Sequence, residues 1–146
     1  MQSTIEEFNN VSSQIYKDTK TFLDEKILQS IIATYPSLLI ATCDDNFDKI
    51  EKGFLLNICK NLVSDDITNE EEQNLYIAEI YSVSIYLILN KNKWENTILN
   101  LLASEIADTP QDKDLIESMM FGMAESSEGI SSIEKETINK INNIIF

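Results

Sequence analysis

The sequence contains no histidine, and it has only two cysteines, three glycines and two prolines in 146 residues. Without histidine, and with Cys43 and Cys59 far from a Cys-x-x-Cys spacing, a zinc site of the usual composition is excluded. Both cysteines are expected to be small core residues. So few glycines and prolines supply too few turns for a sandwich or a barrel. We therefore expect an all-helical fold.

The chain is also poor in basic residues and in long apolar runs. It has 11 Lys and Arg against 25 Asp and Glu, a formal net charge of -14. Such a surface repels nucleic acid and anionic membranes, and it favours cations or basic protein surfaces as partners. The longest apolar stretch, Ile77 to Leu89, is interrupted by Glu79 and two serines, and no signal-peptide pattern is present. We expect a cytoplasmic protein without direct membrane insertion.

The familiar catalytic motifs are missing from the sequence. It has no Gly-rich phosphate loop, no Gly-x-Ser-x-Gly elbow and no cysteine beside a plausible base. Carboxylates are abundant, but hydrolysis by a carboxylate pair requires a cleft that tunes the two groups differently. We predict that the protein is not an enzyme, and a carboxylate-dependent hydrolase is the least favoured alternative.

Apolar residues recur with helical spacing through the chain. Because proline disfavours helix at the residue before it, Tyr35-Pro36-Ser37 is expected to separate two helices. The segment from Asn69 to Leu89 is apolar over the widest arc, so it is expected at the centre of the bundle. With no linker-like segment, residues 1–146 are expected to form one domain of about seven helices. The expected helical segments are 3–34 with a break near 17–21, 36–43, 49–63, 69–89, 94–107, a helix opened by Thr109 and Pro110, and 132–146.

One heptapeptide pattern occurs three times, at 45–51, 65–71 and 128–134. It consists of an acid, a small or turn-forming residue, an apolar residue, a capping residue, two variable residues and Glu. The first and third copies extend on both sides without a gap, at one constant offset that aligns Ala41 with Ala124 and Leu55 with Ile138. This self-similarity predicts two related helix-turn-helix halves.

Most positions of the heptapeptide have a structural explanation as a capping box, in which a cap residue is followed three positions later by Glu. The leading acid is the exception, because a carboxylate at the C-terminal end of a helix meets the negative end of its dipole. Binding a cation at this carboxylate would compensate for the unfavourable interaction with the helix dipole. The expected pairs are Asp48 with Glu51, Thr68 with Glu71, and Ser131 with Glu134, and the leading acids are Asp45, Asp65 and Glu128.

Acids accumulate around each of the three copies, and oxygen-only clusters suit calcium, magnesium or manganese. An EF-hand starting at Asp44 is rejected, because Lys49 stands where glycine is required and Leu55 where the bidentate Glu belongs. Helix capping with solvated charge explains the same residues without a ligand, so both interpretations stay open. The candidate metal ligands are Asp44, Asp45, Asp48, Glu51, Glu125, Glu128 and Glu134.

The segments 41–52 and 123–135 resemble the two helix-turn-helix motifs of the tellurite-resistance TerB family. The Asp-Gly pair of that family corresponds to Asp45-Asn46 in the first segment and to Glu128-Gly129 in the second. The first forty residues, the central helices and the middle heptapeptide have no clear counterpart. The resemblance implies an all-helical cytoplasmic protein of a bacterial stress response that binds divalent cations. It would place Asp45, Asp48, Glu51, Glu128 and Glu134 near an acidic surface patch.

Together these observations favour a non-enzymatic acidic helical protein that binds a divalent cation, a basic protein partner, or both. The setting implied by the resemblance is stress response of the tellurite-resistance type. The alternative is an acidic adaptor or inhibitor whose carboxylates mimic nucleic acid phosphates and occupy a basic protein site. The sequence does not determine the oligomeric state.

Overall fold

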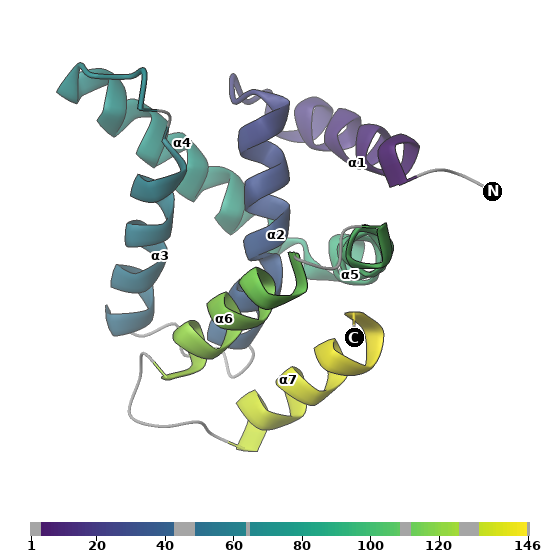
Figure 1. Ribbon diagram of the computed structural model, residues 1–146. Helices are drawn as coiled ribbons and strands as arrows, with labels where there is room; N and C mark the ends of the chain where they lie inside the picture. The colour runs from purple at the N-terminus through teal and green to yellow at the C-terminus, as the bar shows by residue number, and fades with distance from the viewer. Residues whose placement is uncertain (1–3, 43–48, 64, 109–111, 126–131, 146) are drawn as a thin grey trace.

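The computed structural model describes residues 4–42, 49–63, 65–108, 112–125 and 132–145, and these residues form helices without any strand. The prediction of an all-helical fold is confirmed. Figure 1 shows α2 running through the middle of the molecule, with the other helices arranged around it. The described helices are α1 (Thr4–Thr19), α2 (Glu25–Thr42), α3 (Lys49–Leu62), α4 (Glu70–Leu89), α5 (Lys91–Asp108), α6 (Asp112–Glu125) and α7 (Ser132–Ile145).

Helix α2 is the centre of the core, because it packs against every other helix and most extensively against α6. The Asp24 side chain caps its N-terminus by accepting a hydrogen bond from the Ile27 amide at 2.9 Å. Every residue from Thr34 to Ala41 is buried, so this part of the helix is enclosed on all sides. A helix that is apolar around its whole circumference is stable only in such a position.

The expected break at Tyr35-Pro36-Ser37 is wrong, because α2 continues through Pro36. A proline inside a helix removes one backbone hydrogen bond and costs about 3 kcal/mol. Each large apolar side chain that becomes fully buried contributes about 1.5–3 kcal/mol. Ile31, Ile32, Leu38 and Leu39 are all buried around the proline, so tertiary packing outweighs the local preference.

The break between α1 and α2 is confirmed, a few residues later than predicted. Lys20 has a positive φ of 54° and its amide donates to the Tyr16 carbonyl, which ends α1. The Tyr16 hydroxyl donates to the Leu23 carbonyl at 2.6 Å, and the Thr21 hydroxyl accepts from the Leu23 amide. These bonds fix the direction in which the chain enters α2.

The expectation that the helix from Asn69 to Leu89 is central is also wrong. Only the C-terminal half of α4 is in the core, where Ile80, Val83, Ser84 and Leu87 are buried. Its N-terminal half projects from the body of the molecule together with the end of α3 (Figure 1), and Leu75 is 57% exposed there. Helix α5 follows directly after Asn90, so it begins at Lys91 and not at the expected Trp94.

Helix ends recur at the offset seen in the sequence. Helices α2 and α6 end at Thr42 and Glu125, while α3 and α7 span Lys49–Leu62 and Ser132–Ile145. Each of these pairs of ends is separated by the same offset that aligns the first and third heptapeptides. The surroundings of the two hairpins differ, however, because α3 packs against α4 whereas α7 packs against α5. The spacing thus recurs in the helix boundaries, while the packing of the two segments is not the same.

Two further features are the burial of Cys59 and the length and apolarity of the helices. Cys59 is fully buried, as predicted, whereas Cys43 lies outside the described residues. None of the helices in the described part of the chain combines the length and apolarity needed to cross a membrane.

Candidate functional site at the α3–α4 corner

The predicted metal ligands are largely beyond what the structure describes. Asp44, Asp45, Asp48 and Glu128 lie outside the described residues, while Glu51 and Glu125 belong to α3 and α6 but their side chains are not described. Among the described side chains, no three Asp, Glu or Cys residues are grouped closely enough to hold a metal ion.

Glu134 is the member of this set whose side chain is described. It is only 5% exposed and occupies the third position of α7, the position of the Glu in a capping box. A carboxylate in the first turn is stabilised by the helix dipole. Its placement fits the capping interpretation.

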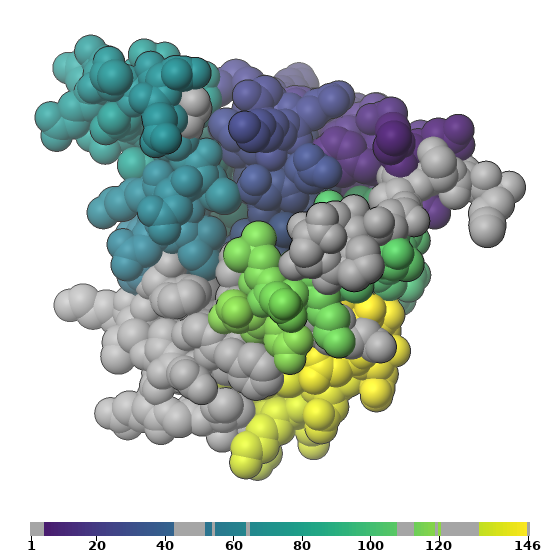
Figure 2. All heavy atoms as spheres, in the orientation of Figure 1, coloured from purple at the N-terminus to yellow at the C-terminus, as the bar shows by residue number. Residues whose placement is uncertain are grey.

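An open groove lies where the end of α3 meets the start of α4. Its volume is about 720 Å³, and the apolar residues of its lining are Val63, Ile67 and Ile77. Figure 2 shows that the region where α3 ends and α4 begins projects beside the N-terminal end of α2. The polar lining residues are Lys60, Asp65, Thr68, Glu70, Gln73 and Asn74.

The turn that forms this groove is held by two hydrogen bonds. The Asn69 side chain caps α4 by accepting from the Glu72 amide at 3.0 Å. The Gln73 side chain donates to the Ile67 carbonyl at 2.7 Å. The expected capping pair of Thr68 with Glu71 is therefore wrong by one residue, because the cap of α4 is Asn69. Asparagine also caps helices well.

A second groove of about 500 Å³ adjoins the first, and the two share Val63 and Asp65. It extends from the α3–α4 turn to the first turns of α2, where Asp24 and Lys26 line it. Asp66 adds another carboxylate between the two helices. The two grooves form one continuous surface, which we call the α3–α4 corner.

The lining of this corner combines carboxylates, the two lysines Lys26 and Lys60, and apolar side chains. Its carboxylates are solvent-exposed, and Glu70, Glu71 and Glu72 follow one another in the first turn of α4. Ionised carboxylates accept hydrogen bonds from ammonium and guanidinium groups, and apolar lining residues can contact the aliphatic stems of the same side chains. The arrangement suits a basic polypeptide segment.

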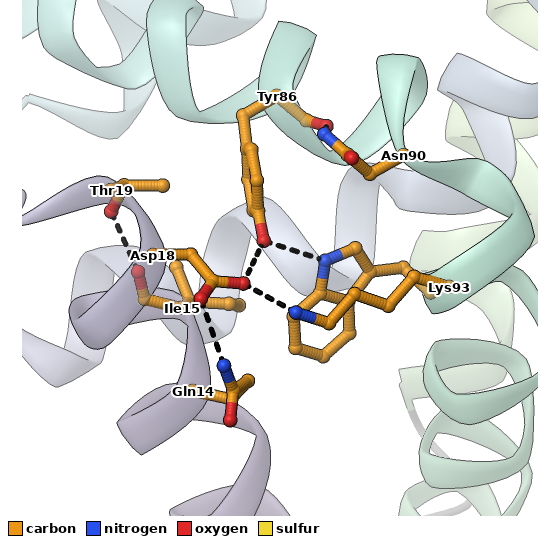
Figure 3. Close-up of polar contacts among 8 residues, drawn as sticks. Gln14, Ile15, Asp18, Thr19, Tyr86, Asn90 and Lys93 are labelled. Carbon is orange, nitrogen blue, oxygen red and sulfur yellow. Dashed lines mark hydrogen bonds and ion pairs between the residues drawn. The ribbon is translucent and has the colours of Figure 1, made fainter.

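A separate polar cluster lies where the end of α1 meets the junction of α4 and α5 (Figure 3). The Asp18 carboxylate accepts hydrogen bonds from the Lys93 ammonium, the Tyr86 hydroxyl and the Gln14 amide. The Tyr86 hydroxyl in turn accepts from the Trp94 indole N–H at 3.0 Å. The Lys93 ammonium also lies 5.1 Å from the centre of the Trp94 ring, within the range of a cation–π interaction.

The electrostatics of this cluster indicate a structural role. Hydrogen bonds from Lys93 and Tyr86 lower the pKa of Asp18 to about 2, so the ionised carboxylate is stabilised within the cluster. Desolvation and the hydrogen bond to Asp18 raise the pKa of Tyr86. The cluster connects α1 to the end of α4, and α4 carries the α3–α4 corner at its other end.

The one described cysteine is equally unsuited to catalysis. Burial raises the pKa of the Cys59 thiol to about 11. The thiolate is the nucleophilic form of cysteine, and that form is scarce at neutral pH when the pKa is so high.

Sequence reasoning identified part of this corner and missed the rest. The middle heptapeptide contains Asp65 and Ile67, and it was interpreted as a helix cap within an acid cluster, not as part of a groove. No local signal connects it to Asp24 and Lys26, which come from the start of α2. The Asp18 cluster was missed for the same reason, because its members are 68 and 75 residues apart in the chain.

Comparison with models of protein families, with curated proteins and with solved structures finds no match to this chain.

Proposed function

We propose that this protein is a non-enzymatic binding protein whose α3–α4 corner captures a basic, partly apolar segment of a protein partner. The observation that carries the proposal is the groove itself, because Asp65 and Glu70 line it together with the apolar residues Val63, Ile67 and Ile77. A positively charged segment is steered toward a protein of net charge -14. Contacts between the aliphatic parts of the segment and the apolar lining residues then make the segment bind this corner in preference to other acidic surfaces.

Mimicry of nucleic acid charge is a different proposal and requires a different surface. A mimic presents carboxylates over a broad face to fill a basic site, so apolar contacts contribute little. The apolar residues that line the α3–α4 corner therefore favour the binding of a peptide segment over mimicry of nucleic acid.

The test uses a short synthetic peptide of alternating lysine and leucine and a chain labelled for NMR. When the peptide is added, we expect the NMR signals of backbone amides around Asp65, Glu70 and Ile77 to change their chemical shifts. Added salt is expected to weaken binding. The double variant Asp65→Asn/Glu70→Gln is expected to bind roughly 10-fold more weakly, because each exposed ion pair contributes at most about 1 kcal/mol.

The matched control is Asp114→Asn/Glu136→Gln, which removes the same charge from exposed positions on α6 and α7. It is expected to retain nearly full affinity. Equal loss of affinity in the two double variants would show that the peptide responds only to net charge, and the proposal would then be abandoned.

A second proposal concerns the resemblance to the TerB family and a site for a divalent cation. The helix boundaries that recur at the offset of the heptapeptides support the resemblance to TerB, because α2 and α6 end, and α3 and α7 begin, at equivalent positions of the two segments. We therefore propose the cation site expected from the sequence, with Asp45 and Glu128 as its leading acids, and with it the stress-response setting of that family.

A further inference from the structure

An apolar stripe runs along the outer side of α4, away from α2 and α3, which both pack against this helix (Figure 1). Its residues recur at alternating intervals of three and four, the spacing of the contact positions in coiled coils. In a helix of 3.6 residues per turn, the stripe lies opposite Ile80, Val83 and Leu87, which are buried in the core. The stripe consists of Leu75, Ala78, Ser82, Ile85 and Leu89.

This stripe leaves large apolar side chains in contact with water. Leu75 is 57% exposed and Leu89 is 77% exposed, while Ile85 is partly buried. Ala78 and Ser82 between them are exposed as well. A helix that is apolar on opposite sides is typical of a fully buried position, yet a single chain buries only one side of the C-terminal half of α4. Contiguous exposed apolar surface of this kind marks an interaction site.

The order of residues along α4 favours a second copy of the chain as the partner. The small residues Ala78 and Ser82 lie within the stripe, with Leu75 before them and Ile85 and Leu89 after them. Two α4 helices that run in opposite directions and cross at the small residues can approach closely there. The larger side chains of each copy then pack against the opposite half of the other helix.

The charges at the two ends of α4 fit the same antiparallel arrangement. Glu70 to Glu72 form its first turn, whereas Lys91 and Lys93 follow its C-terminal end. In an antiparallel pair, the glutamates of one copy lie beside the lysines of the other, and the opposed helix dipoles attract each other. Lys93 already pairs with Asp18, so Lys91 is expected to supply the main contact. A parallel pair would instead bring like charges together at both ends.

We propose that two copies of the chain associate through α4 as an antiparallel dimer with twofold symmetry. The interface is isologous, because the same stripe serves both copies. The net charge of -14 on each copy opposes association, but salt at physiological strength screens that repulsion beyond about 8 Å. One pair of helices is a small interface, so the dimer dissociates on dilution. Gln73 and Ile77 of the α3–α4 corner lie on another side of α4, so the dimer does not depend on the proposed peptide binding.

The first test is sedimentation equilibrium of the whole chain over a wide range of concentrations, in about 0.15 M salt. The mass is expected to rise with concentration from 16.7 kDa toward twice that value. Leu89→Gln is expected to weaken the dimer by roughly 10-fold or more, because each dimer loses two buried leucines. Leu115→Gln is the matched control, since Leu115 on α6 is 59% exposed, and it is expected to leave the dissociation constant unchanged. A chain that stays monomeric throughout, or equal effects of the two variants, would overturn the proposal.

Charge reversals test the antiparallel orientation. Glu71→Lys and Lys91→Glu are each expected to weaken self-association several-fold, because each makes the charges at the two ends of α4 less complementary. A mixture of the two variants is expected to associate more tightly than either alone, since the introduced lysine of one copy then lies beside the introduced glutamate of the other. Glu136→Lys on α7 is the control for net charge and is expected not to weaken the dimer. Tighter self-association of Glu71→Lys alone than of this control would indicate a parallel pair and overturn the proposal.

Discussion

Replacing Tyr35 by Phe is expected to stabilise this protein, although it alters one of the most deeply buried side chains. The ring remains in place and only the hydroxyl oxygen is removed, so no sizeable cavity forms. That hydroxyl is buried without a partner among the described residues. An unsatisfied buried polar group costs about 1–3 kcal/mol. We expect the free energy of unfolding to rise by about 1–2 kcal/mol, the lower part of that range.

Tyr16→Phe is the matched control, because the same atom is removed where it has a partner. The Tyr16 hydroxyl donates to the Leu23 carbonyl at 2.6 Å in the turn between α1 and α2. A hydrogen bond of this kind contributes about 0.5–1.5 kcal/mol. We therefore expect Tyr16→Phe to lower the free energy of unfolding by that amount, opposite in sign to Tyr35→Phe.

The assay is urea unfolding followed by circular dichroism, in a buffer without phosphate or carboxylate ions. The midpoint urea concentration should rise for Tyr35→Phe and fall for Tyr16→Phe, while the slope with denaturant stays the same. In a thermal scan, each change of about 1 kcal/mol should move the midpoint by roughly 2–5 °C for a chain of this size. If Tyr35→Phe destabilises the protein as much as Tyr16→Phe, the Tyr35 hydroxyl has a partner and the argument is refuted.

Two other predictions concern carboxylates. The pKa of Asp18 is about 2 in the folded protein against its usual 3.8, so its contribution to stability is present above that usual value and is lost as the pH falls toward 2. Asp18→Asn should therefore show a smaller loss of stability between pH 4 and pH 2 than the natural chain, measured by urea unfolding at each pH, and an identical loss would contradict the assignment. Calorimetric titration with calcium or manganese should give a binding signal that Asp45→Asn and Glu128→Gln abolish, and a signal unchanged by both would remove the proposed cation site.

How far the sequence predicts this fold depends on whether the relevant interaction is local. The all-helical class, most helix positions and the break after α1 follow from apolar spacing and from few glycines and prolines. The cap of α4 was misplaced by one residue because Thr68 and Asn69 are both good caps, and local chemistry does not choose between them. The start of α5 was placed at Trp94 because the polar residues before it resemble a connector, yet they form its first turn.

The candidate site was likewise predictable from the sequence only where its residues are close together in the chain. The acids and apolar residues of the middle heptapeptide are visible in the sequence, but the groove also requires Asp24 and Lys26 from the start of α2. Packing of α2 and α4 against α3 brings these segments together. Asp45 and Glu128 lie outside the described residues, so the cation site remains a prediction from the sequence alone.

By itself, the sequence determined the helical character of the chain, its strongly negative charge and the recurrence of helix ends at the offset of the first and third heptapeptides. These properties depend on backbone preferences and on residue types close together in the chain. Only the tertiary structure decided that α2 is the central helix, that Pro36 is accommodated within it, and that Asp18 meets Lys93. Those outcomes depend on apolar burial and hydrogen bonding between distant segments, where the free energy of packing exceeds the local preference of any single residue.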